Sequence, residues 1–265
     1  MTQSDHVDQE LDAHFAEQSG LFQTVEKNGG FQALFMSGKA NHLLETNGQC
    51  TCIDEGTKRG TRRHAGSGLN HALSILTKGG LKDRAALDAA IVAIVDNLKD
   101  AGLTTITSHD ECGAAGLVWG LLSQGFKDEM GWKEAVDLAK WFSSEVANRL
   151  ELKYEHIGVE RPHFHIALGV LVDLVGGLNP DGVEGAPEMF TVSACDNAEE
   201  GVSQTVLAAK IATGGHGYGE KITEAEPFRV VIATKAGTDN SAFLQRLRMG
   251  LAEFGNRVKI EVCYL

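Results

Sequence analysis

Three side chains that bind transition metals occur in two short segments of the chain. Cys52 belongs to CTCID (50–54), and His109 and Cys112 belong to SHDECG (108–113). Thiolates and imidazoles are soft to borderline ligands that suit zinc. Three protein ligands leave the fourth tetrahedral position open for water, whose pKa zinc lowers to about 7. The pattern is therefore typical of a catalytic rather than a structural zinc site.

The two segments are predicted to lie at the ends of two strands. CTCID (50–54) has the pattern of a short buried strand, and LTTITS (103–108) is rich in β-branched residues. A helix is expected to begin directly after Cys112, and a helix N-terminus favours a thiolate at that position. In parallel α/β sheets, functional sites lie at the carboxyl ends of strands, which is where these ligands fall.

Asp54 follows Cys52 by two residues and would share its face of a strand. Beside a metal-bound water, its carboxylate could orient that water, or it could turn inward and ligate the metal itself. An arginine paired with Asp54 would keep it ionised and turned outward. Four basic residues follow within reach along the chain: Lys58, Arg59, Arg62 and Arg63.

The remaining pattern alternates helices and apolar strands. Helices are predicted at 69–78, 84–99, 132–150, 198–211 and 240–254, and strands within 164–175, 189–195, 227–234 and 257–265. The segment 31–37 fits either a helix or a strand. We expect a single α/β domain over 1–265, with a mostly parallel central sheet flanked by helices and an N-terminal helical extension at 1–45.

Composition excludes several classes of function. The formal net charge of -12 argues against a nucleic-acid partner. No run of eighteen apolar residues is present, so no membrane span is expected. The acidic, polar start lacks the features of a signal peptide, and the five cysteines are odd in number. We therefore predict a cytoplasmic protein with free or metal-bound thiols.

Other interpretations of the same residue types remain open. Cys52 and Cys112 could be small buried hydrophobic residues, as free cysteines often are. Cys50 competes as a ligand, although it has no acidic residue two positions after it. The pair His163 and His165 has strand spacing but is more typical of polar residues at a strand end. Cys195 has no nearby H-x-x-C partner and is interpreted as a structural thiol.

Taken together, the motifs resemble those of a known family. Cys52-x-Asp54 followed by His109-x-x-Cys112-Gly113 resembles the signature of β-class carbonic anhydrases, C-x-D-x-R then H-x-x-C-G. Arg63-His64-Ala65-Gly66-Ser67 is similar to the family's R-N-A-G-N segment. The short stretch from Cys52 to Gly66 is closer to the diatom cadmium/zinc (ζ-class) carbonic anhydrase domain or to the limiting-CO2-inducible proteins. The resemblance covers about residues 50–120.

The resemblance implies a zinc-dependent lyase of the β-carbonic anhydrase fold, with Cys52, His109 and Cys112 as ligands of zinc or substituting cadmium. Metal-bound hydroxide would attack CO2 to give bicarbonate, and the protein would be a homodimer. Asp54 with Arg59 or Arg63 would form the catalytic pair, and the substrate pocket would be lined by Gly66, Ser67 and Gly113.

One position departs from the family pattern. The arginine expected two residues after Asp54 is replaced by Gly56. This replacement favours one alternative, a non-catalytic relative that binds bicarbonate or regulates a partner. A hydrolase of CS2 or COS is a second alternative, because these molecules are small, linear and apolar like CO2.

Overall fold

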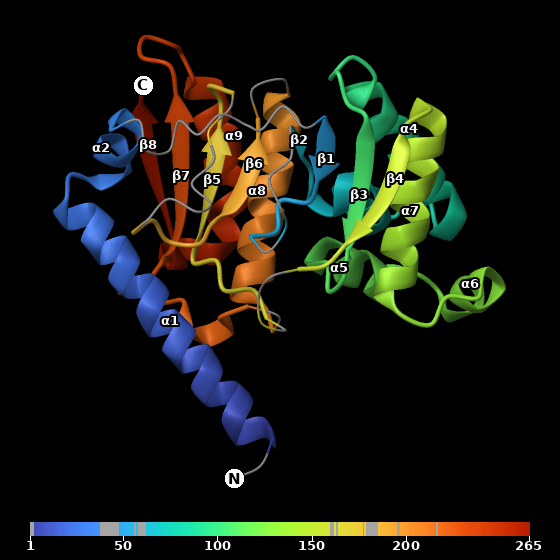
Figure 1. Cartoon of the computed structure of the whole chain (residues 1–265), viewed down its shortest axis with the longest axis horizontal. Helices are drawn as coiled ribbons and strands as arrows, with labels where there is room; N and C mark the ends of the chain where they lie inside the picture. Colours follow the sequence, from blue (N-terminus) through green and yellow to red (C-terminus); the bar gives the residue numbers. More distant parts are fainter. Residues whose placement is uncertain are drawn as a thin grey trace. The chain divides into compact units, whose positions relative to one another are not determined.

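The structure is a computed structural model that describes most of the chain (Figure 1). The described residues are 3–37, 48–55, 57, 62–159, 162, 164–176, 178, 185–194, 197–215 and 217–265, with the backbone alone described for 3–8. The positions singled out from the sequence that lie outside these ranges are Gly56, Lys58, Arg59, His163 and Cys195.

The chain is organised as two compact units. Unit 1 contains Met1–Leu43 and Arg161–Leu265, and unit 2 contains Leu44–Glu160. Each unit has its own four-stranded, fully parallel sheet flanked by helices, so the α/β class is confirmed. We expected one central sheet, whereas the described residues form two. The sequence did not predict this division, because an apolar pattern indicates strands without saying which strands pair. The assignment of 1–265 to one β-carbonic anhydrase-like domain stays a prediction.

The sheet of unit 2 has the strand order β2-β1-β3-β4. Its strands are β1 (Gln49–Thr51), β2 (Arg62–Arg63), β3 (Thr105–His109) and β4 (Lys153–Ile157). Its helices are α3 (Leu69–Lys78), α4 (Asp83–Leu98), α5 (Gly113–Leu121), α6 (Gln124–Met130), α7 (Ala135–Leu150) and the 3-10 helix η1 (Ala65–Gly68).

The core of unit 2 lies between β3 and α7, which pack against each other. Every residue of β3 is buried, and Ile106 is fully so. The α7 side chains Leu138, Phe142 and Val146 recur at helical spacing and are also fully buried. The packing of α7 on β3 therefore holds the strand that ends at His109.

The sheet of unit 1 has the order β6-β5-β7-β8, which is the same relative order as in unit 2. Its strands are β5 (Gly169–Asp173), β6 (Phe190–Ser193), β7 (Phe228–Thr234) and β8 (Val258–Tyr264). Its helices are α1 (Gln3–Lys27), α2 (Gly30–Met36), α8 (Ala198–Thr213), α9 (Ser241–Leu251), η2 (Gly219–Lys221) and η3 (Ala252–Arg257). Within the described residues, no helix has the length and apolar character that crossing a membrane requires.

Most predicted elements are confirmed, and the exceptions are informative. The helix predicted at 69–78 is α3, and the segment 31–37 is helical as α2. The predicted helical extension contains α1 and α2, which belong to unit 1. Strand β4, with the sequence KYEHI, was not predicted, because an edge strand with alternating polar residues lacks a continuous apolar signal.

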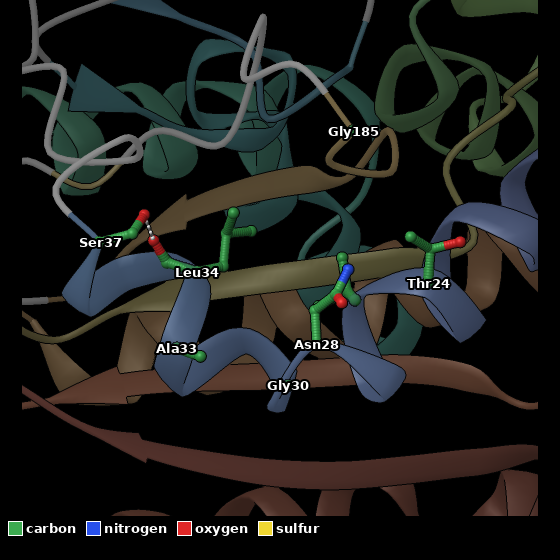
Figure 2. A pocket seen from close by; sticks show the side chains of 8 residues that line it. Thr24, Asn28, Gly30, Ala33, Leu34, Ser37 and Gly185 are labelled. Carbon is green, nitrogen blue, oxygen red and sulfur yellow. Dashed lines mark hydrogen bonds between the residues drawn. The ribbon is translucent and has the colours of Figure 1, made fainter.

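A hollow of about 330 Å³ lies between α1 and α2 of unit 1 (Figure 2). Leu34 and Ala33 supply apolar walls, and the Ser37 hydroxyl donates to the Leu34 carbonyl at 2.7 Å. None of the described residues that line this hollow is titratable. Its described lining therefore offers hydrogen bonds and apolar contact but no group for acid–base chemistry.

One glycine of unit 2 is required by both backbone conformation and packing. Gly68 has φ +113°, and a Cβ there would lie 2.6 Å from Ile94 Cγ1 on α4. We expect Gly68→Ala to lower the free energy of unfolding by about 3 kcal/mol, combining roughly 1–3 for overpacking and roughly 1–2 for a left-handed alanine. Denaturant-induced unfolding of the full chain measures this change.

Gly79 supplies the matched control. It also has a left-handed φ of +73°, but a Cβ there meets nothing within 4 Å. Gly79→Ala should therefore lower the free energy of unfolding only by the contribution of the left-handed backbone, about 1–2 kcal/mol. Equal losses in the two variants would contradict the close approach of α4 to Gly68.

Candidate metal centre

The candidate centre lies at the carboxyl ends of β1 and β3, where the strand order of unit 2 reverses. Strands β1 and β3 are parallel neighbours, with Cys50 opposite Ile106, and β2 lies on the other side of β1. The connections that leave β1 and β3 therefore diverge at their carboxyl ends, which leaves room for a ligand. Cys52 follows β1 by one residue, and His109 is the last residue of β3.

Cys52, His109 and Cys112 come together at this point. Their ligand atoms all lie within 4.8 Å of one another, and the two Sγ atoms are 4.0 Å apart. Two Zn–S bonds of about 2.3 Å at a tetrahedral angle require sulfurs about 3.8 Å apart. The three predicted ligands therefore form one group whose sulfur spacing is close to that of a zinc site. All three side chains are buried. Cys50 is buried in β1 and is not part of this group.

The orientation of His109 also fits a metal ligand. Its Nδ1 lies 2.7 Å from the Asp110 carbonyl oxygen, which can only accept, so Nδ1 carries a hydrogen. In the neutral ring Nε2 then has the free lone pair. This Nε2 is buried and has no hydrogen-bond partner among the described residues. A buried lone pair without a donor is costly unless a cation takes that place.

Charge in the group is unevenly shared between the two cysteines. Burial raises the pKa of Cys52, but the donating Cys112 thiol and the charged His109 outweigh it and hold the pKa well below its ordinary value. The pKa of Cys112 is well above its ordinary value, because Cys112 donates to Cys52 and is buried. Burial lowers the pKa of His109, yet the Cys52 thiolate and Asp54 raise it to about 9. A divalent cation bound here would displace the protons of Cys112 and His109.

Backbone donors complete the surroundings of Cys52. The Gly66 N–H donates to Cys52 Sγ at 3.1 Å, which favours the thiolate. Gly66 and Ser67 both have left-handed φ angles, of 55° and 52°, and this turn aims the Gly66 N–H at the sulfur. The Ser67 hydroxyl donates to the Thr107 carbonyl of β3. Ser67, predicted to line the substrate pocket, thus fastens the turn to the sheet, while Gly113 begins α5 directly after Cys112.

Asp54 lies beside the group, although not on a strand as we expected. Strand β1 ends at Thr51, and the next residues form a turn in which the Thr57 hydroxyl donates to the Asp54 carbonyl at 2.8 Å. The Asp54 side chain is buried, and its Oδ2 is 3.9 Å from His109 Nε2. The carboxylate therefore faces the side of the imidazole that a metal would occupy.

Arg63 contacts the backbone of Asp54. It lies on β2 and is buried, and its Nη2 donates to the Asp54 backbone carbonyl at 2.9 Å. The guanidinium thus fastens the turn that carries Asp54. Arg59, the other predicted partner of Asp54, lies outside the described residues.

Sequence reasoning missed a set of polar residues behind His109. Tyr154 and His156 of β4 reach Ser108 of β3 through hydrogen bonds. The alternation in KYEHI, with Tyr154 and His156 on one face, is the signal that would have found them. His165, the described member of the second histidine pair, is buried in unit 1 and packs against Phe190 with ring centroids 5.2 Å apart.

Comparison of the chain with protein-family models, curated proteins and solved structures gives no match. The resemblance to carbonic anhydrases therefore rests on the motif residues themselves.

Removal of one thiol tests the metal group. We expect Cys112→Ser to weaken zinc binding by more than about tenfold, because loss of a direct ligand costs more than loss of a supporting residue, which already costs 10–100-fold. Elemental analysis of the purified full chain after dialysis measures the zinc content.

Cys263→Ser is the control, since Cys263 is also buried but belongs to β8 of unit 1. This variant should keep the zinc content of the unaltered chain. Zinc retained in full by Cys112→Ser would remove Cys112 from the metal group.

Proposed function

We propose that unit 2 is a zinc-dependent enzyme of carbonic anhydrase type that interconverts CO2 and bicarbonate. The observation that carries the proposal is the gathering of Cys52, His109 and Cys112 around one point, with the Asp54 carboxylate facing it. Three ligands of this kind fit zinc and leave one position open for a small reactant. When bound, zinc acidifies a water molecule, which then serves as the nucleophile near neutral pH.

The donor set favours zinc over harder cations. Two sulfurs and one imidazole nitrogen are poor ligands for magnesium or calcium, which prefer oxygen. The same softness admits cadmium, as the ζ-class resemblance implies. The buried Nε2 of His109 and the sulfur spacing of 4.0 Å support a tetrahedral ion of this size.

Asp54 has the position of a group that orients the nucleophile. Its Oδ2 is 3.9 Å from His109 Nε2, too far for a hydrogen bond between them. The carboxylate can instead accept a hydrogen bond from a water molecule at the open position and turn one lone pair of that water toward CO2. Arg63 supports this arrangement by holding the Asp54 backbone carbonyl.

The alternatives differ in how Asp54 is used. If the Asp54 carboxylate itself became the fourth ligand, no position would remain for a nucleophile, and the protein would bind bicarbonate without turnover. CS2 and COS are linear and apolar like CO2, so the same apparatus would serve a hydrolase. Gly56, at the position of the family's arginine, is the feature that favours the non-catalytic alternative.

Stopped-flow CO2 hydration by the zinc-loaded full chain tests the proposal. We expect a rate well above that of the buffer, and we expect Asp54→Asn to lower it by about 100-fold or more, the usual range for a proton-accepting group. Zinc content measured on the same samples should be equal, since asparagine preserves the shape of the side chain.

A rate equal to that of the buffer for the fully zinc-loaded chain would contradict the carbonic anhydrase proposal. Turnover of CS2 or COS by the same sample would then identify the hydrolase alternative. Full activity of Asp54→Asn would contradict the role given to the carboxylate.

A further inference from the structure

Four polar side chains form a continuous hydrogen-bonded chain next to the metal group. Strands β3 and β4 are in parallel register, with Ser108 opposite His156. The Tyr154 hydroxyl is 2.7 Å from Ser108 Oγ, and Ser108 Oγ is 2.8 Å from His156 Nδ1. At the other side of the ring, His156 Nε2 is 3.0 Å from Asp110 Oδ1. All four residues belong to unit 2.

The chemistry of the last link sets the direction of every hydrogen bond. The Asp110 carboxylate accepts only, so His156 Nε2 must carry a hydrogen. In the neutral ring Nδ1 then accepts from the Ser108 hydroxyl, and Ser108 accepts from the Tyr154 hydroxyl. Donors and acceptors therefore match at every link of this hydrogen-bonded series, which fixes His156 in one tautomer and one orientation.

This series of hydrogen bonds ends at Asp110, the residue that orients His109. Asp110 is held on two sides, because its carboxylate accepts from His156 and its backbone carbonyl accepts from His109 Nδ1 at 2.7 Å. Glu111, the next residue of the turn, has a left-handed φ of 53°, an unfavourable conformation for a non-glycine residue. The Asp110 side chain is 56% exposed and would turn to water without its partner. The bond from His156 therefore steadies the turn between two metal ligands.

The same residue types form the triad of serine hydrolases, but the arrangement here differs in two ways. In those enzymes Nε2 of the histidine faces the serine and Nδ1 faces the aspartate. Here the ring is reversed, with Nδ1 toward Ser108 and Nε2 toward Asp110. Ser108 is also only 3% exposed and is bonded to two neighbours. A nucleophile needs access to its substrate, so the group supports the metal ligand instead.

We propose that His156 is a positioning residue for the zinc ligand His109, acting through Asp110 and held in place by Ser108. The role rests on the zinc site proposed above. By fixing the Asp110 carbonyl, His156 keeps the hydrogen on Nδ1 of His109 and aims the Nε2 lone pair at the point shared with Cys52 and Cys112. Supporting residues of this kind typically contribute 10–100-fold to metal affinity.

Zinc affinity of the full chain, measured by competition with a chelator, tests the role without any activity assay. We expect His156→Ala to weaken zinc binding by about tenfold or more. His156→Gln should recover most of the affinity, because its amide can still donate to the Asp110 carboxylate. Glu155→Gln, whose side chain pairs with Lys153 on the opposite face of β4, is the control and should bind zinc like the unaltered chain.

Cobalt substitution adds a spectroscopic readout of ligand geometry. The visible absorption bands of the Co2+-loaded chain should shift or broaden in His156→Ala, because the His109 ring is no longer fixed, and should return in His156→Gln. Asp110→Ala cuts the same link at a half-exposed side chain and should weaken zinc binding similarly, even if His156→Ala fails to fold.

The outcomes separate the two proposals. Unaltered zinc affinity and cobalt spectra in a folded His156→Ala or Asp110→Ala variant would overturn the positioning role while leaving the zinc site intact. An equal loss of zinc affinity in His156→Gln and His156→Ala would also overturn it. Failure of the unaltered chain to bind zinc would overturn the zinc site and the positioning role together.

Discussion

The candidate site depends on β1 and β3 lying side by side in one parallel sheet. Their pairing brings the segment after Thr51 and the segment after Ser108 to the same edge, although His109 comes 57 positions after Cys52 in the sequence. Unit 1 repeats the strand order, but the segments that follow β5 and β7, LVGGL and KAGTD, contain no cysteine or histidine. There Asp173 instead accepts from the backbone N–H groups of its own loop, including Val175 and Gly176. The topology thus supplies the place, and the side chains supply the chemistry.

Burial makes a cation favourable beside these side chains. Two thiols, an imidazole and a carboxylate are all less than a tenth exposed, and the imidazole Nε2 has no donor among the described residues. Without metal, the lowered pKa of Cys52 and the raised pKa of His109 favour a buried thiolate–imidazolium pair, whose attraction offsets part of the cost of burying both charges. A divalent ion would allow both cysteines to bind as thiolates and would take the Nε2 lone pair of a neutral His109, whose Nδ1 keeps its hydrogen.

From the sequence, the three candidate ligands could be predicted, but most of the residues that hold them in place could not. Cys52, His109 and Cys112 were recognisable because ligand chemistry and strand ends coincide in the motifs. Strand β4 was missed because its residues alternate in polarity, and His156 was missed with it. The Gly66 N–H bond to Cys52 depends on left-handed backbone at Gly66 and Ser67, which no side-chain pattern reveals. The division into two sheets depends on strand pairing, which local periodicity does not contain.

The central claim is that two cysteines and one histidine of unit 2 bind a single zinc ion. X-ray absorption at the zinc edge of the loaded full chain tests it most directly. The account predicts two sulfur neighbours at about 2.3 Å and two lighter neighbours, one of them the His109 nitrogen, at about 2.0–2.1 Å. A shell of four sulfurs, or one without sulfur, would contradict it.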